Sequence, residues 1–207
     1  MSERCEALSI TGIILAGGQS SRMGRDKALL PVPGEPALTF VTHLACLLAD
    51  HCQETLLVAR DQYQAQAYQP HLPSSIQVFT DQVANIGPLM GLYSGLSAIH
   101  TSHALVAAVD MPFLQPALLN FLFSQAQPDT VTMPRVAGQE QVLLAVYPRA
   151  ILPLIEQRLR EGRRDPRSLL QLARVHLLEE EQLQAVDPQL RSFININTPE
   201  EFSRYQP

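Results

Sequence analysis

A stretch rich in glycine, hydroxyl and basic residues begins at the end of the first apolar run, 10–15. It reads Leu15-Ala-Gly-Gly-Gln-Ser-Ser-Arg-Met-Gly-Arg-Asp-Lys27. Its glycines let the backbone turn tightly and come close to a ligand, because no Cβ intervenes. Serine hydroxyls and the cations Arg22, Arg25 and Lys27 add donors and positive charge. A loop of this composition suits a triphosphate.

The spacing within this loop excludes two common nucleotide motifs. A P-loop needs G-x-x-x-x-G-K-[ST], but Lys27 is followed by Ala28, so the hydroxyl that would contact magnesium is missing. The glycines do not follow G-x-G-x-x-G either, which excludes the dinucleotide fingerprint.

Two aspartates end apolar runs of strand length. Asp81 closes the run 76–80, and Asp110 closes the run 104–109. Ligands bind outside the carboxyl ends of strands in open parallel sheets, so we expect both carboxylates beside the glycine-rich loop. Mg²⁺ favours one or two carboxylates completed by phosphate oxygens and water, which makes Asp110 a candidate metal ligand. The structural alternative is an N-cap for a helix near Pro116.

The role of Asp81 and of the segment after it stays open. Asp81 is expected to bind the nucleotide ribose or base, to share the metal through water, or to serve only as a turn residue. Gly87 and Pro88 predict the start of a helix that contains Gly91 and Gly95. These small residues permit the close approach of a ligand or, equally, of a strand.

Strand-length apolar runs alternate with longer periodic segments. The predicted strands are 10–15, 55–59, 76–80, 104–109, 130–133, 142–147, 175–178 and 193–196. The predicted helices are 37–48, 62–68, 89–100, 116–125, 150–161 and 168–173, and Thr198-Pro-Glu-Glu201 has the form of a capping box. Nearly continuous apolar strands are typical of a sheet covered on both faces. The alternation predicts one α/β domain over 1–207 with a mostly parallel sheet.

Composition and charge narrow the class of protein. The chain has 207 residues, 46% hydrophobic and 17% charged, which is ordinary for a soluble globular protein. Its net charge of −5 argues against nucleic-acid binding. We see neither a secretory signal nor an apolar run near the ~18 residues of a membrane span. The cysteines, at 5, 46 and 52, form no C-x-x-C pair and are expected to be free thiols of a cytoplasmic protein.

The loop 15–27 resembles the nucleotidyltransferase signature L-A-G-G-x-S-x-R-M-G-x-x-K, with every fixed position present. The whole chain resembles the molybdenum cofactor guanylyltransferases, which make molybdopterin guanine dinucleotide. The matching segments follow the family order: 15–27, Asp81 with 87–91, 109–112, 161–164 and 195–201. The resemblance implies a single-domain, three-layer αβα, Rossmann-like nucleotidyltransferase fold, with an acceptor-side half at roughly 111–207.

The resemblance also implies the reaction and its residues. GMP would pass from GTP to the terminal phosphate of molybdopterin, with Mg²⁺ on Asp110 and with release of pyrophosphate. Lys27 and Arg22 would stabilise the leaving group, and no general base is needed because the attacking phosphate is already ionised. The expected nucleotide contacts are Leu15, Ala16, Gly17, Gly18, Lys27, Asp81 and Asp110. The expected acceptor-side residues are Arg163, Arg164, Asn195 and Asn197.

Two departures from the family pattern leave rival functions open. The segment Val58-Ala-Arg60 stands where the family often has Asn, and Gln141-Val142 stands where a His-Pro or Glu-Pro is common. One rival is a cytidylyltransferase acting on molybdopterin or another phosphorylated small molecule. Relatives that use CTP more often have Leu-Ala-Ala-Gly where this chain has Leu-Ala-Gly-Gly at residues 15–18. The other rival is a non-catalytic adaptor, although the chain retains Lys27 and Asp110.

Arginines at 158, 160, 163, 164 and 167 form the main basic concentration of this acidic chain. They are interpreted either as a solvated helix end near Gly162 or as a site that attracts the anionic acceptor. The same charges could dock an acidic partner, such as another protein of molybdenum cofactor biosynthesis or of molybdoenzyme maturation.

Overall fold

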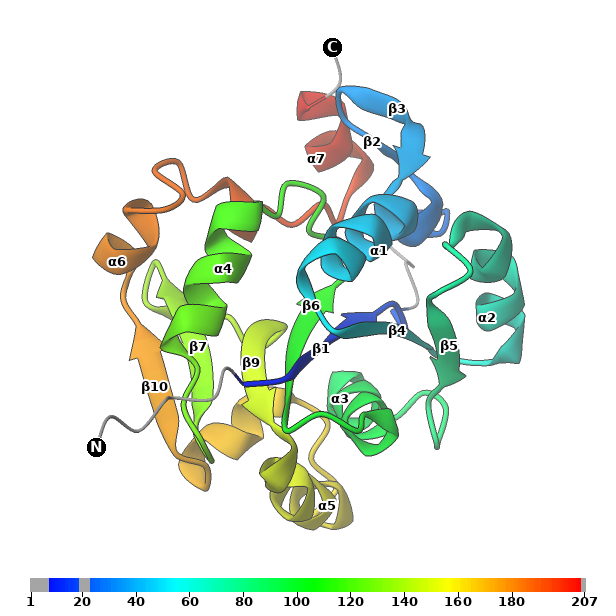
Figure 1. The fold of residues 1–207 in the computed structure, drawn as a ribbon. Coiled ribbons are helices and arrows are strands. Elements are labelled where there is room, and N and C mark those ends of the chain that lie inside the picture. Colours follow the sequence, from blue (N-terminus) through cyan, green and yellow to red (C-terminus); the bar gives the residue numbers. More distant parts are fainter. Residues whose placement is uncertain (1–7, 19–22, 206–207) are drawn as a thin grey trace.

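A computed structural model describes residues 8–18 and 23–205 of the chain. A mixed sheet lies between two layers of helices (Figure 1). Its strands follow the order β10-β7-β9-β6-β1-β4-β5, with β8 paired to β7. The strands are β1 (Ile10–Leu15), β4 (Glu54–Ala59), β5 (Gln77–Thr80), β6 (His103–Ala108), β7 (Val131–Val136), β8 (Gln139–Glu140), β9 (Leu144–Pro148) and β10 (Val175–Leu178).

Strand directions confirm a mostly parallel sheet. β1 pairs in parallel with β4 and β6, β4 with β5, and β10 with β7. β9 runs antiparallel to both β6 and β7. The carboxyl ends of β1, β4, β5 and β6 therefore meet along one edge of the sheet, as the α/β prediction requires.

Helices cover both faces of the sheet (Figure 1). They are α1 (Phe40–His51), α2 (Gln62–Tyr68), α3 (Pro88–Ala98), α4 (Pro116–Gln125), α5 (Leu152–Arg160), α6 (Glu180–Gln184) and α7 (Pro199–Arg204). Successive side chains of a strand point to opposite faces, so Ile13 and Ile14 of β1, both 0% exposed, enter different cores. Ile14 packs in the core that includes α1 and α4, and Ile13 in the core that includes α3 and α5.

Several predicted elements are confirmed, some with the predicted bounds. β1, β10, α2 and α4 begin and end where the sequence predicts, and the other six-residue strands and longer helices shift by a few residues. The structure also adds a two-stranded hairpin, β2 (Pro31–Val32) with β3 (Glu35–Thr39). Residues 37–39, predicted as helix, belong to β3, and Thr39 then caps α1 by accepting a hydrogen bond from the Thr42 amide.

Two further elements differ from their predictions. The predicted strand 193–196 is a 3₁₀ turn at Arg191–Phe193 followed by irregular chain. This segment makes an isolated backbone bond, from Ile196 N to Asp110 O at 3.0 Å, instead of a strand ladder. The predicted helix 168–173 is a 3₁₀ helix, Pro166–Gln171, which Asp165 caps through the Arg167 amide.

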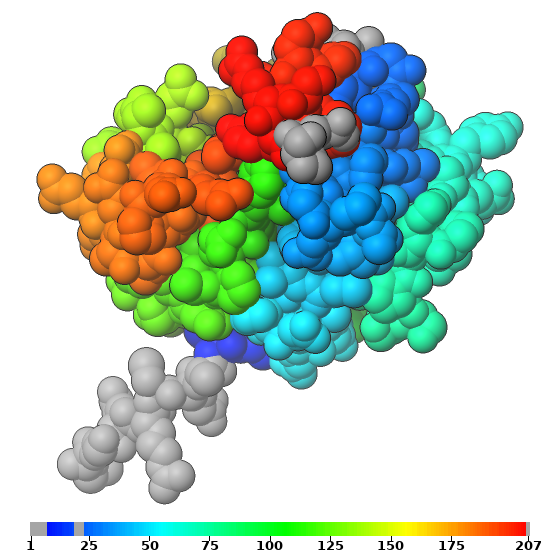
Figure 2. Space-filling model, turned by 90° about the horizontal axis from the view of Figure 1, so that it is seen from above, coloured from blue at the N-terminus to red at the C-terminus, as the bar shows by residue number. Residues whose placement is uncertain are grey.

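The last helix of the described chain packs near an early segment of the sequence. Figures 1 and 2 show the C-terminal α7 beside the region of β2 and β3. The ring of Phe202 on α7 lies 6.3 Å from that of Phe40 at the start of α1. No helix in residues 8–18 and 23–205 is long and apolar enough to cross a bilayer.

Candidate active site

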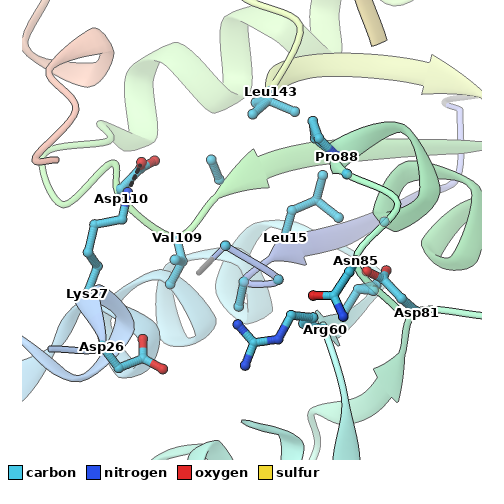
Figure 3. Close-up of a pocket in the computed structure, with 17 residues that line it drawn as sticks. Leu15, Asp26, Lys27, Arg60, Asp81, Asn85, Pro88, Val109, Asp110 and Leu143 are labelled. Atoms are coloured by element: carbon cyan, nitrogen blue, oxygen red, sulfur yellow. Dashed lines mark hydrogen bonds and ion pairs between the residues drawn. The ribbon is translucent and has the colours of Figure 1, made fainter. Parts of the chain in front are cut away.

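A cavity of about 400 Å³ opens at the carboxyl ends of β1, β4, β5 and β6, as Figure 3 shows from close by. This volume is in the range of small-molecule sites. The cavity is lined by Leu15, Ala16, Gly17, Gly18, Asp26, Lys27, Val58, Arg60, Asp81, Asn85, Gly87, Pro88, Gly91, Ala108, Val109, Asp110 and Leu143. The described residues that the sequence assigned to the nucleotide therefore share one cavity. Arg22 lies outside the described residues.

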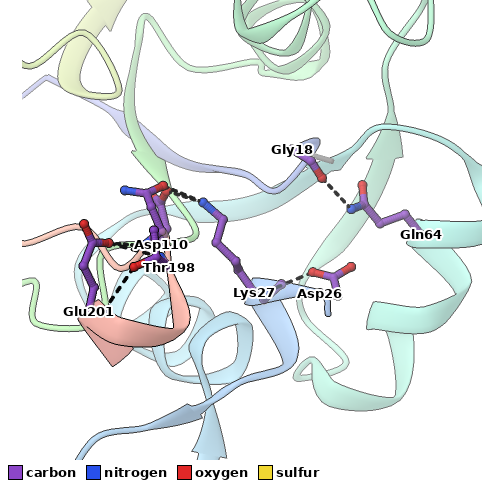
Figure 4. A network of polar contacts seen from close by, with 9 residues as sticks. Gly18, Asp26, Lys27, Gln64, Asp110, Thr198 and Glu201 are labelled. Atoms are coloured by element: carbon purple, nitrogen blue, oxygen red, sulfur yellow. Dashed lines mark hydrogen bonds and ion pairs between the residues drawn. The ribbon is translucent and has the colours of Figure 1, made fainter. Parts of the chain in front are cut away.

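A charged pair occupies one end of the cavity. Lys27 Nζ lies 2.8 Å from Asp110 Oδ2, and these side chains are 15% and 17% exposed. The same ammonium donates a hydrogen bond of 2.9 Å to Asn197 Oδ1. A cation is thus held between a carboxylate and an amide oxygen, on segments that are far apart in the sequence (Figure 4).

The backbone of Lys27 is fixed from two sides. Asp26 caps the short 3₁₀ helix Lys27–Leu29 by accepting a hydrogen bond of 3.0 Å from Ala28 N. The other carboxylate oxygen of Asp26 accepts a hydrogen bond of 2.8 Å from the hydroxyl of Tyr68, a fully buried side chain of α2. The lysine therefore extends from an anchored turn rather than from a free loop.

Asp81 lies at the opposite end of the cavity from the charged pair (Figure 3). Its Oδ1 is buried and has no hydrogen-bond partner among the described residues. Burial raises the pKa of this carboxyl to about 6. A buried acceptor without a partner is costly, and a ligand that brings N–H or O–H donors would satisfy it.

The two glycines of α3 have different surroundings, which separates the two interpretations of their role. A Cβ at Gly95 would lie 2.8 Å from Ile13 Cγ2, so this glycine lets α3 pack on β1. A Cβ at Gly91 would lie 3.4 Å from Leu15 Cδ2 and 3.5 Å from Asp81 Oδ1, and Gly91 lines the cavity. Close packing explains Gly95, whereas Gly91 keeps space beside Asp81.

Comparisons with known proteins identify the family of this chain. A model of the MobA-like NTP transferase domain matches residues 12–183. The chain belongs to this family. It is 35% identical over 207 residues to a probable molybdenum cofactor guanylyltransferase of Chloroflexus aggregans. This match covers 96% of this chain and 94% of the relative. A relative with the same description from Pelotomaculum thermopropionicum is 33% identical over 192 residues, or 93% of this chain and 89% of its own.

A solved structure shows the same fold. Molybdopterin-guanine dinucleotide biosynthesis protein A from Archaeoglobus fulgidus superposes with a TM-score of 0.80 at 26% identity, and the match covers 95% of this chain and 96% of that one. The three-layer α/β nucleotidyltransferase fold predicted from the sequence is thereby confirmed, and this MobA-like protein is a nucleotidyltransferase by family.

Arg60 is a cavity residue of this MobA-like protein that the sequence analysis did not assign to the site. Its Nε donates a hydrogen bond of 2.9 Å to Asp61 Oδ2. Figure 3 shows its guanidinium extending between Asp26 and Asn85. The side chain of Gln64 joins Arg60 to Gly18. Its oxygen accepts a hydrogen bond of 2.8 Å from Arg60 N, and its nitrogen donates one of 3.5 Å to Gly18 O. Because Arg60 directly follows β4, the strand-end rule used for Asp81 and Asp110 would have found it.

The acceptor-side residues do not form one group in this nucleotidyltransferase. Asn197 contacts Lys27, as described above. Arg164 reaches the cavity wall through its main chain. Its carbonyl oxygen accepts a hydrogen bond of 3.0 Å from Leu89 N. The same oxygen would lie 3.3 Å from a Cβ on the cavity-lining Gly87. Arg163 and Asn195 are exposed and are not cavity-lining residues.

Within the arginine group, the described contacts give three members a structural role. Arg158 is buried and pairs with Glu161 at 2.6 Å. Arg160 pairs with Glu156 at 3.3 Å, and Arg167 with Asp165 at 3.5 Å. The pairs of the exposed Arg160 and Arg167 favour the solvated-helix-end interpretation, whereas Arg158 is a buried structural residue.

The described residues contain no group of three or more His, Cys, Asp or Glu that could hold a metal ion. A metal at this site would therefore take most of its ligands from substrate oxygens and water, which is how Mg²⁺ commonly binds beside phosphates.

Proposed function

We propose that this MobA-like protein transfers GMP from GTP to the terminal phosphate of molybdopterin, giving molybdopterin guanine dinucleotide and pyrophosphate. The observation that carries the proposal is the pairing of Lys27 with Asp110 at one end of a cavity that residues 15–18, 26 and 27 of the signature loop help to line. The names of relatives from Chloroflexus aggregans and Pelotomaculum thermopropionicum, both probable molybdenum cofactor guanylyltransferases, support the choice of substrates.

The two ends of the cavity suit the two ends of GTP. The charged end, at Lys27 and Asp110, suits the phosphates. The other end combines the donors of Arg60 with the unpartnered carboxylate oxygen of Asp81. A carboxylate can accept from the N1–H and N2–H of guanine, and an arginine can donate to the O6 of the same base.

The donor set at the charged end fits Mg²⁺. Asp110 Oδ2 and Asn197 Oδ1 already converge on one cation, the ammonium of Lys27, and both are the hard oxygens that Mg²⁺ prefers. When bound, the ion would neutralise charge on the phosphate oxygens. In this proposal Asp110 would hold it, and Lys27 would leave the pair to contact the phosphates.

The chain's own residues supply positioning and charge rather than a general base. No His, Ser or Cys is among the described cavity-lining residues, and none is needed because a phosphate nucleophile is ionised at neutral pH. Lys27 would balance the negative charge that grows on the departing pyrophosphate. Arg22, outside the described residues, remains a predicted second cation for this role.

The decisive experiment compares nucleotides with one acceptor. Purified protein with molybdopterin and Mg²⁺ should release pyrophosphate with GTP at least ~100-fold faster than with CTP or ATP, because a base hydrogen-bonded at a buried polar group is strongly selected. A faster reaction with CTP would establish the cytidylyltransferase rival, and no reaction with any nucleotide would favour the adaptor. The single domain with an acceptor-side half at 111–207, and a cytoplasmic location, stay predictions.

A further inference from the structure

The segment that ends the described chain contacts both members of the charged pair. Ile196 N donates to the backbone oxygen of Asp110 at 3.0 Å, and the side chain of Ile196 is fully buried. The next residue, Asn197, accepts from Lys27 Nζ at 2.9 Å. The position of the ammonium therefore depends on where the backbone of residues 196–197 is held.

A carboxylate binds the next two backbone amides. Glu201 Oε2 accepts from Asn197 N at 2.6 Å and from Thr198 N at 3.2 Å. In return, Glu201 N donates to Thr198 Oγ1 at 3.2 Å, which completes the capping box of α7 (Figure 4). The bond to Asn197 N goes beyond the reciprocal pair that a capping box requires.

The helix that carries Glu201 is itself anchored to the signature loop. Phe202 is 4% exposed and packs against Phe40. The guanidinium of Arg25, two residues before Lys27, lies 5.5 Å from the centre of the Phe202 ring. The segment 197–202 thus contacts the loop at Arg25 through the Phe202 ring and at Lys27 through Asn197.

We propose that Glu201 is a positioning residue, which sets Lys27 for catalysis by fixing the backbone of Asn197; this inference rests on the proposed transfer reaction at the same site. Without the carboxylate, Asn197 can move, and the amide oxygen that it holds against Lys27 Nζ moves with it. A displacement of about 1 Å at a catalytic group can cost up to ~100-fold in rate while binding is little changed.

The first test separates turnover from binding. Glu201→Ala is expected to lower kcat for pyrophosphate release about 10-fold or more and to change the KM for GTP less than about 2-fold. Glu201→Gln should recover most of the rate, because its carbonyl can still accept one of the two amide bonds. Equal kcat in Glu201→Ala and wild type would overturn the proposal.

Two controls separate positioning from loss of helix stability. Thr198→Ala removes the hydroxyl half of the capping box but leaves Glu201 bonded to Asn197, so its kcat should fall much less than that of Glu201→Ala. Glu200→Ala removes an exposed carboxylate from the same turn and should leave kcat unchanged. Equal losses in Thr198→Ala and Glu201→Ala would show that only the helix cap matters.

A second readout needs no turnover. Lys27 is the only lysine in the sequence, so acylation of its ε-amine can be followed in untagged protein by mass spectrometry. Acylation should be several-fold faster in Glu201→Ala than in wild type or Glu200→Ala. An unchanged acylation rate in Glu201→Ala would overturn the inference even if wild type transferred no nucleotide. If Glu201→Ala were acylated faster but wild type transferred no nucleotide, only the proposed function would be refuted.

Discussion

At the scale of single residues, the choice of lysine at position 27 has a physical meaning. The chain carries 15 lysine and arginine residues, and every one except Lys27 is an arginine. Arginine is a rigid planar fork, whereas lysine is a compact charge on a flexible stem. In the proposed reaction, this flexible cation would exchange Asp110 and Asn197 for substrate phosphates.

Replacing this lysine should disable turnover. Lys27→Ala is expected to slow pyrophosphate release by ~100-fold or more, because a positioned cation for the leaving group is lost. Lys27→Arg should recover little of the rate, since the larger fork does not fit between the two oxygens. Steady-state assays with GTP check both variants, and unaltered release by Lys27→Ala would refute its role.

The carboxyl of Asp81 should make stability depend on pH. Burial raises its pKa to about 6, so the folded chain binds the proton more tightly than the unfolded chain. The free energy of unfolding therefore falls as pH rises from about 4 to about 6, through this group. Asp81→Asn should be more stable than wild type at pH 8 by roughly 1 kcal/mol, after allowance for the solvent near this half-buried group.

Urea unfolding at pH 8 and pH 4.5 measures this difference, which should shrink at the lower pH. The exposed Asp50→Asn provides a control with no expected change. Nucleotide binding by Asp81→Asn should weaken at the same time, as is common for residues that sacrifice stability for function. A destabilised Asp81→Asn at pH 8 would contradict the argument.

At the scale of elements, the two glycines of α3 give the sharpest contrast. Gly95 faces the stiff, fully buried Ile13, and Gly91 faces the cavity. Gly95→Ala should lower the free energy of unfolding by about 1–2 kcal/mol, because overpacking outweighs the gain in helix propensity. Chemical denaturation measures this loss.

Gly91→Ala is the matched variant one helical turn earlier. Its added Cβ meets only ordinary contacts, so stability should hold or rise by up to about 1 kcal/mol. The same Cβ approaches Asp81 and should weaken nucleotide binding. If both variants lost the same stability, the distinction between the packing glycine and the cavity glycine would fail.

The sequence predicts those elements whose local signals are self-contained. The largely apolar run of β1 and the periodic segment of α4 need no partner to be recognised, and their bounds are as predicted. The β2–β3 hairpin and the irregular 193–196 segment depend on distant contacts, the latter on Asp110. The nucleotide side of the cavity was predictable because its residues follow the ends of strands. The contact of Asn197 with Lys27 was not predictable, because it depends on how distant segments pack.

At the scale of the whole molecule, nucleotide should stabilise the fold together with metal. Free Mg-GTP at about 100 times its dissociation constant should add ~2.7 kcal/mol to stability, or roughly 5–10 °C in Tm. Addition of EDTA should remove most of this increase, and Asp110→Asn should not show it. Thermal scans measure the effect, and an equal increase with EDTA present would argue against a metal at Asp110.

The hydrogen bond between Lys27 and Asn197 joins residues 170 positions apart. Ribosomes deliver a polypeptide from its amino end, so the described cavity-lining residues, which end at Leu143, emerge before this tether exists. A growing chain, or one clipped near its tail, would retain a pocket for the nucleotide while its ammonium lacked the amide oxygen. In the proposed reaction, catalysis would therefore begin only after residue 197 has joined the fold.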